Sequence, residues 1–123
     1  MKNISKLFLS FLATAILLSS CKEKEYVLGD LKAPTNLAIT AVVKGVTTAT
    51  PNGDGSGDVT FTVSADNALS YKIDYDATNA LDLVYLPTGT TTKKYTTLGT
   101  NTYKVTAVAY GRGGTSTTIT KDV

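Results

Sequence analysis

The sequence contains no histidine and no tryptophan, and it has a single cysteine. Without histidine, a Ser-His-Asp triad, a histidine metal site and imidazole acid–base catalysis are excluded. One cysteine allows neither an internal disulfide nor a cluster of thiolate metal ligands. Tryptophan is the side chain most often expected where a protein stacks on sugar rings, and it is missing, whereas tyrosine occurs seven times. These absences predict a protein that is not an enzyme and carries no cofactor.

An excess of charge of one sign is also absent. The chain has 12 basic and 10 acidic side chains. Lys2 and Lys6 lie in a segment that we expect to be removed, which leaves ten basic residues against ten acidic ones. Binding to nucleic acid needs clustered Lys and Arg that displace counterions, so we expect no nucleic-acid partner. A length of 123 residues is typical of one domain.

The first residues have the pattern of an export signal. A basic start, with Lys2 and Lys6, precedes the apolar run 7–18, LFLSFLATAILL. This run is too short for a membrane-spanning helix, which needs about 20 residues, but it has the length of a signal-peptide core. We therefore predict that residues 1–20 are a signal peptide.

The residues at the end of this segment, Leu18-Ser19-Ser20-Cys21, resemble the bacterial lipobox. The resemblance implies that Cys21 receives a diacylglyceryl group and becomes the mature N-terminus, and two acyl chains anchor a protein stably. The alternative is an ordinary signal peptide with a free cysteine near its end. The charged stretch 22–25 is similar to tags that follow the lipidated cysteine in surface lipoproteins of Bacteroidetes-type bacteria, although a solvated tether explains it equally. We expect a lipidated cysteine and linker over 21–34, and a surface-exposed position on the outer membrane.

Residues 35–123 alternate between apolar and polar side chains, which indicates strands with one buried face. Turn-forming residues separate these runs. Short strands at this spacing, without a helical period between them, predict an all-β, antiparallel sandwich of about seven strands. The alternating residues are Leu37, Ile39 and Ala41; Val59, Phe61, Val63 and Ala65; Tyr71, Ile73 and Tyr75; Tyr103, Val105, Ala107 and Ala109; and Thr117, Ile119 and Lys121.

Three segments of this region together resemble a polycystic-kidney-disease (PKD) domain. They are LSYKIDYD at 69–76, Lys94-Tyr95, and NTYKVTAVAYG at 101–111. The resemblance implies an immunoglobulin-like sandwich that serves as a spacer or adhesive module, often beside polysaccharide-degrading or glycan-binding domains. The family's Gly-Asp-Gly turn is replaced here by Asp76-Ala77-Thr78, which leaves the conformation of that loop open.

Two acidic motifs are candidates for chemistry. The segment 52–58, NGDGSGD, resembles the first half of an EF-hand calcium loop, but Val63 stands where a bidentate carboxylate is needed. We expect a mobile glycine-rich loop instead of a metal site. Asp74 and Asp76, two apart on a predicted strand, are expected on one outward face. Glycoside hydrolysis uses two carboxylates, yet no cleft is expected to enclose these. The resemblance to PKD domains implies instead that they form a turn.

The tyrosines form two groups. Tyr71, Tyr75 and Tyr103 alternate with polar neighbours and are predicted to lie in the core. Tyr85, Tyr95 and Tyr110 are candidates for an exposed platform that contacts sugar or peptide; the alternative is that they also pack on the sandwich, with their hydroxyls at its rim. Lysines at 93 and 94 are expected near a sheet edge, where they discourage strand pairing.

From these features we expect a non-catalytic surface lipoprotein module that acts as a spacer, in adhesion or in glycan capture. Its partners would be the membrane, through the lipid, and a polysaccharide or another surface protein. Two alternatives remain open. One is the N-terminal tethering module of a longer polysaccharide-degrading enzyme, and the other is a structural envelope protein without a ligand.

Overall fold

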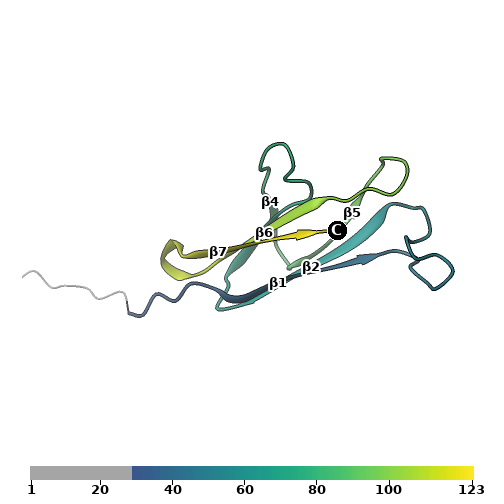
Figure 1. Ribbon diagram of the computed structural model, residues 1–123. Coiled ribbons are helices and arrows are strands. Elements are labelled where there is room, and N and C mark those ends of the chain that lie inside the picture. Colours follow the sequence, from purple (N-terminus) through teal and green to yellow (C-terminus); the bar gives the residue numbers. More distant parts are fainter. Residues whose placement is uncertain (1–28) are drawn as a thin grey trace, which may run out of the picture.

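The computed structural model describes residues 29–123, which form seven strands in two antiparallel sheets. Figure 1 shows the sheets packed against each other. The prediction of an all-β sandwich with about seven strands is confirmed. The elements are β1 (Thr35–Val43), β2 (Asp58–Asp66), β3 (Ser70–Asp74), β4 (Val84–Leu86), β5 (Thr90–Lys94), β6 (Lys104–Tyr110), the short 3-10 helix η1 (Arg112–Gly114) and β7 (Ser116–Asp122).

The strand order is β1-β2-β5 in one sheet and β4-β3-β6-β7 in the other. Each pair of neighbouring strands is antiparallel. β2 and β6, which both lie inside their sheets, contribute most of the buried hydrophobic residues. Lys93 and Lys94 lie on β5, at an edge of the three-stranded sheet, as predicted.

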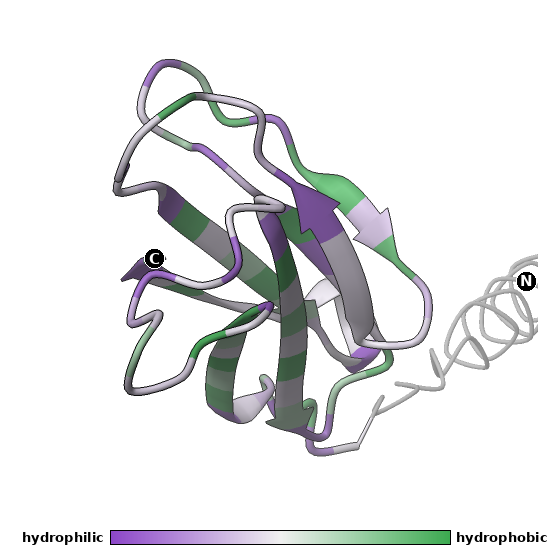
Figure 2. Ribbon diagram, turned by 90° about the vertical axis from the view of Figure 1, so that its right-hand side faces the viewer, coloured by the Kyte–Doolittle hydropathy of each residue, from purple (hydrophilic) through white to green (hydrophobic). Residues whose placement is uncertain are grey.

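The core follows from the alternation of the sequence. In β2, the apolar residues at 59, 61 and 63 are buried, whereas the threonines between them are exposed. Bands of alternating hydropathy run along the strands in Figure 2. The side chains from both sheets meet in one cluster of buried residues: Ile39, Val59, Phe61, Val63, Ile73, Leu86, Val105 and Ala107. One-sided burial thus selects this register, since a shift by one residue would expose the whole apolar set.

Strand β4 was not predicted from the sequence. It has only three residues, too few for an alternating pattern to be visible. Leu86 nevertheless fills the core, with 3% of its surface exposed, because it lies opposite Tyr71 of β3 in the sheet.

The chain enters the sandwich at one end, which we call the proximal end. Pro34, at the boundary of the predicted linker, is fully buried, and its carbonyl accepts a hydrogen bond from the hydroxyl of Thr117 (2.6 Å). The carbonyl of Lys32 accepts one from Thr115 (3.4 Å). The chain therefore contacts the sheet containing β7 shortly before β1 begins.

The opposite, distal end carries the loops 44–57, 75–83 and 95–103. Val123 also lies there, since its N–H and carbonyl pair with Tyr103 (2.9 and 2.7 Å). In Figure 1 the described chain enters on the left, and two of the distal loops lie on the right. Within residues 29–123, no helix is both long enough and apolar enough to cross a bilayer.

Candidate ligand-binding site at the distal end

An aromatic cluster lies beneath the distal loops. The ring of Phe61, which is fully buried, lies 5.6 Å from the ring of Tyr75 and 6.5 Å from that of Tyr95, the latter in a T-shaped contact. Tyr95 is stacked on Tyr103, with 3.9 Å between ring centroids and an interplanar angle of 22°. Such contacts stabilise aromatic pairs beyond the burial of their area. The core therefore holds the Tyr95–Tyr103 pair in place from below.

The hydroxyl of Tyr95 is fixed as well. It donates a hydrogen bond to the carbonyl oxygen of Tyr75 (2.9 Å). Burial, and after it the negative charge that Tyr103 and Asp76 can carry, raises the pKa of Tyr95 well above its ordinary value of 10.0. Tyr95 therefore stays protonated, and a hydrogen-bond donor, over the whole range in which the protein would work.

The tyrosines predicted to form an exposed platform do not share one surface. Tyr95 is only partly exposed and packs against the core at the distal end. Tyr85, 59% exposed, and Tyr110 lie on the outer face of the four-stranded sheet, where the ammonium of Lys72 lies 5.8 Å from the ring centroid of Tyr110. The prediction that the three tyrosines form a single platform is therefore wrong. Tyr95 continues the inward-facing positions of β5 and so points away from the outer face of the other sheet. Contact of any of the three with a ligand stays a prediction.

The other three tyrosines pack as predicted. Tyr71, Tyr75 and Tyr103 are partly buried against the core cluster. The hydroxyl of Tyr71 also accepts a hydrogen bond from the Ala65 N–H (3.2 Å), toward the proximal end. Tyr75 and Tyr103 belong to the distal cluster, which the sequence did not reveal as a unit.

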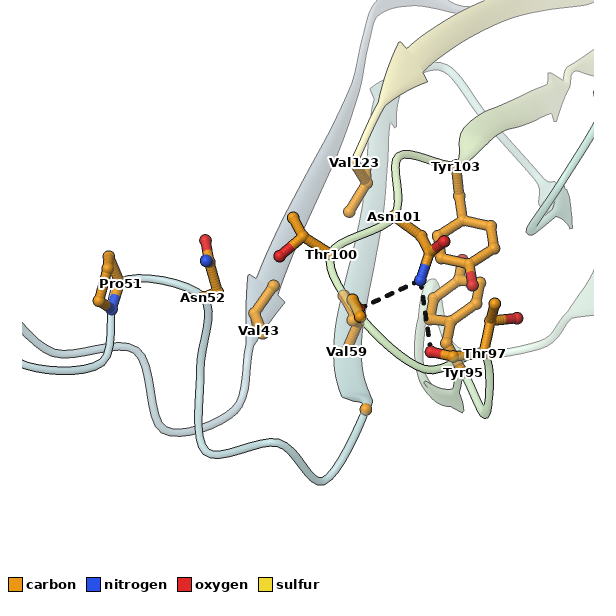
Figure 3. Close-up of a pocket in the computed structure, with 12 residues that line it drawn as sticks. Val43, Pro51, Asn52, Val59, Tyr95, Thr97, Thr100, Asn101, Tyr103 and Val123 are labelled. Atoms are coloured by element: carbon orange, nitrogen blue, oxygen red, sulfur yellow. Dashed lines mark hydrogen bonds between the residues drawn. The ribbon is translucent and has the colours of Figure 1, made fainter.

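Two hollows flank the Tyr95–Tyr103 pair. The first, with a volume of about 270 Å³, lies between the loop at Pro51 and the loop 97–103 (Figure 3). None of its lining side chains is charged, and we call it the uncharged hollow. Its lining residues are Val43, Pro51, Asn52, Gly57, Val59, Tyr95, Thr97, Gly99, Thr100, Asn101, Tyr103 and Val123.

The second hollow, on the side of β4 and β5, has a volume of about 620 Å³. Acidic and basic side chains line it together with Tyr75, Val84 and the tyrosine pair, and we call it the charged hollow. The charged residues are Asp74, Asp76, Asp82, Lys93 and Lys94. The ammonium of Lys93 lies 5.3 Å from the centroid of the Tyr75 ring. Lys93 therefore covers the aromatic cluster on this side.

Hydrogen bonds fix both walls of the uncharged hollow. On one side, the amide nitrogen of Asn101 donates to the carbonyls of Thr97 (3.3 Å), Leu98 (3.2 Å) and Gly99 (3.1 Å), and two of these bonds are drawn in Figure 3. On the other side, the N–H of Tyr95 donates to the carbonyl of Gly57 (2.8 Å). The hollow is therefore shaped by the fold before any ligand arrives.

The acidic loop 52–58 forms part of this wall. The Asp54 carboxylate accepts a hydrogen bond from the Ser56 N–H (2.9 Å), and hydrogen bonds from Ser56 lower the pKa of Asp54. The ammonium of Lys44 forms an ion pair with the carboxylate of Asp58 (3.4 Å). The carboxylates of Asp54 and Asp58 are thus already engaged by groups of the protein. In the described part of the chain, no three His, Cys, Asp or Glu side chains are grouped so that they could hold a metal ion.

The two acidic residues at the end of β3 are not a pair on one exposed face, and this prediction is wrong. Asp74 is 4% exposed, and its two oxygens accept hydrogen bonds from the N–H groups of Asp76 (2.9 Å) and Asp82 (2.6 Å). Asp76 is exposed, because β3 ends at Asp74 and the chain turns away from the sheet. The predicted role as turn formers is confirmed, since Asp74 organises the loop 75–83.

Comparison with protein-family models, with curated proteins and with solved structures found no match. The strands themselves define the chain as a small all-β domain of two antiparallel sheets. The signal peptide and Cys21 lie outside the described residues.

Proposed function

We propose that the protein is a non-catalytic, lipid-anchored surface module of the PKD type that presents its distal end to ligands outside the cell. The observation that carries this proposal is the opposite placement of the two ends of the sandwich. The predicted lipid at Cys21 precedes the proximal end, whereas the aromatic cluster and both hollows lie at the distal end.

The length of the strands sets the separation between these ends. β1 runs from the proximal to the distal end in nine residues. At about 3.3 Å per residue, this distance is about 30 Å. The predicted linker would add to it. A module of this kind separates its ligand-contacting loops from the bilayer, which suits a spacer, an adhesin or a glycan-capturing accessory domain.

The chemistry of the distal end supports a binding role more than a catalytic one. Of the carboxylates in the charged hollow, Asp74 already accepts two backbone hydrogen bonds. Both oxygens of this carboxylate are therefore engaged in holding the loop 75–83. The sequence also supplies no histidine as an alternative base.

A second candidate is the tethering module of a longer polysaccharide-degrading enzyme. The resemblance of 69–76 and 101–111 to PKD domains, which often stand beside polysaccharide-degrading domains, supports this candidate. Sequencing the native gene beyond the codon for Val123 tests this candidate; a stop codon there would exclude it. A third candidate is a structural envelope protein without a ligand, and the absence of any ligand for the distal end would favour it.

The anchor is tested with the full chain expressed in a lipoprotein-processing bacterium. Wild-type protein is expected in the membrane fraction and in reach of an added protease on intact cells. Cys21→Ala is expected to lose the membrane association, because the acylated thiol is gone. Lys22→Ala, the neighbouring control, should stay in the membrane fraction. A Cys21→Ala protein that still sediments with membranes would contradict the proposal.

A further inference from the structure

We infer that the uncharged hollow is a binding site for one ring-sized unit of a neutral saccharide, held against the Tyr95–Tyr103 pair. The inference rests on the proposed function, because it identifies the ligand that the distal end would contact. It places the contact at residues other than Tyr85 and Tyr110, on a different part of the molecule.

The apolar part of the hollow comes from strand ends and the tyrosine pair. Side chains of Val43, Val59 and Val123, from β1, β2 and the residue after β7, meet beside the two rings (Figure 3). Ligand sites usually combine such an apolar surface with a few polar groups, in volumes of roughly 300–1,000 Å³. A hollow of about 270 Å³ is close to the lower limit and fits one ring.

The polar side chains that line the hollow are all neutral. Amides at Asn52 and Asn101 and hydroxyls at Thr97 and Thr100 line it, without any charged side chain. Lys44, Asp54 and Lys94 line a neighbouring hollow that shares six lining residues with this one, but they do not line this one. A charged group seated here would therefore lose hydration without an oppositely charged side chain in the lining. A wholly apolar ligand would cover the amides and hydroxyls without satisfying them. The lining therefore favours a neutral ligand with both an apolar face and hydroxyl groups.

A pyranose ring has these two properties. Its C–H face can lie on a tyrosine ring, and its hydroxyls can exchange hydrogen bonds with amides and with threonine side chains. The amide nitrogen of Asn101 is already engaged by three loop carbonyls, so its oxygen is the atom offered to a hydroxyl donor.

Packing and hydrogen bonds hold the aromatic surface and the neighbouring loop in place. Phe61 supports Tyr95, Tyr95 supports Tyr103, and Asn101 closes the loop that carries the threonines. A ligand therefore does not have to order the aromatic surface, and preorganisation of this kind lowers the entropic cost of binding.

The test uses the full lipidated chain in detergent micelles and isothermal titration calorimetry. The probes are four neutral polysaccharides (a β-glucan, a galactan, a xylan and a galactomannan), with alginate and dextran sulfate as charged controls. At least one neutral probe is expected to bind with a saturable isotherm, and the charged ones are not.

Variants locate the site. Thr100→Trp fills the hollow from an exposed loop position and is expected to weaken binding at least about tenfold, equivalent to about 1.4 kcal/mol. Asn52→Asp, also exposed, introduces a charge and should weaken it as well. Thr118→Trp is the matched control: Thr118 is an exposed threonine of β7 that does not line the hollow, so the affinity should stay within about twofold. Thermal unfolding monitored by circular dichroism verifies that each variant is folded.

Three results would overturn the inference. They are the absence of binding to every neutral probe, binding to the charged polysaccharides alone, and neutral binding that survives Thr100→Trp. These failures are distinguishable from a failure of the anchor, because the titration does not depend on where the protein is located in the cell.

Discussion

Replacing Phe61 by alanine is expected to destabilise the domain more than any surface change. Phe61 is fully buried at the centre of β2, between the two sheets, and its ring contacts those of Tyr75 and Tyr95. The substitution removes the buried ring and leaves a cavity among residues that belong to both sheets.

The magnitude follows from these contacts. Burial of a phenylalanine side chain contributes about 1.5–3 kcal/mol, and each aromatic pair adds about 0.5–1.5 kcal/mol. A loss of about 3–5 kcal/mol, typical of a buried Phe→Ala change, is therefore expected. Since small domains have total stabilities of about 5–15 kcal/mol, the variant should be close to unfolding.

Urea unfolding followed by tyrosine fluorescence and by circular dichroism measures this loss. With a urea m-value of about 1–3 kcal/mol per molar, the midpoint should fall by at least about 1 M. Leu98→Ala is the control, since Leu98 is 95% exposed and should change the free energy of unfolding by less than about 0.5 kcal/mol. An unchanged midpoint for Phe61→Ala would refute the packing described for β2.

Three further predictions concern the distal end. Gly57→Ala should destabilise the domain clearly more than Gly55→Ala in urea unfolding: both glycines have positive φ (74° and 78°), but only at position 57 would a Cβ collide with the carbonyl of Tyr95. Asp74→Ala should cost about 1–3 kcal/mol in the same assay, because two backbone N–H groups lose their acceptor; an unchanged midpoint would mean that the loop 75–83 does not depend on it. Folding raises the pKa of Tyr95 above its ordinary value of 10.0. The stability that the protonated hydroxyl contributes is therefore complete below that value and is lost progressively as the pH rises above it. The wild-type midpoint should therefore fall as pH rises above about 10, and Tyr95→Phe should fall less steeply; equal slopes would contradict the assignment.

The sheets were predictable because their residues repeat with a period of two. The runs around Phe61 and Val105 alternate over enough residues to identify strands. β2 is buried on one face as expected, whereas in β6 Thr106 and Val108 on the other face are also buried, each 6% exposed. The core tyrosines followed from the same alternation. β4 was missed because three residues carry no period.

The distal site was not predictable in the same way. Tyr95 and Tyr103 stack across a loop, and their contact depends on how β5 and β6 are placed in different sheets. No local pattern encodes that placement. The sequence did contain one signal for the position of Tyr95. Thr91 and Lys93 face inward in the register of β5 with β2, and Tyr95 continues this series of every second residue. Using it requires the strand pairing, which the sequence alone did not supply.

The burial of Asp74 was also beyond the sequence. Alternation along β3 predicts an outward position, and that position would be exposed on a bare sheet. The loop 75–83 covers the carboxylate by donating a hydrogen bond from Asp82, eight residues further along the chain. A polar side chain can therefore be buried by a loop that no period describes.

The central claim, a lipid-anchored module, is tested most directly by mass spectrometry of the N-terminal peptide from the native protein, purified from the membrane fraction of its source organism. The account predicts that this peptide begins at Cys21 and carries the mass of a diacylglyceryl group on the thiol. An N-terminal peptide with an unmodified cysteine, or one that retains residues 1–20, would contradict it.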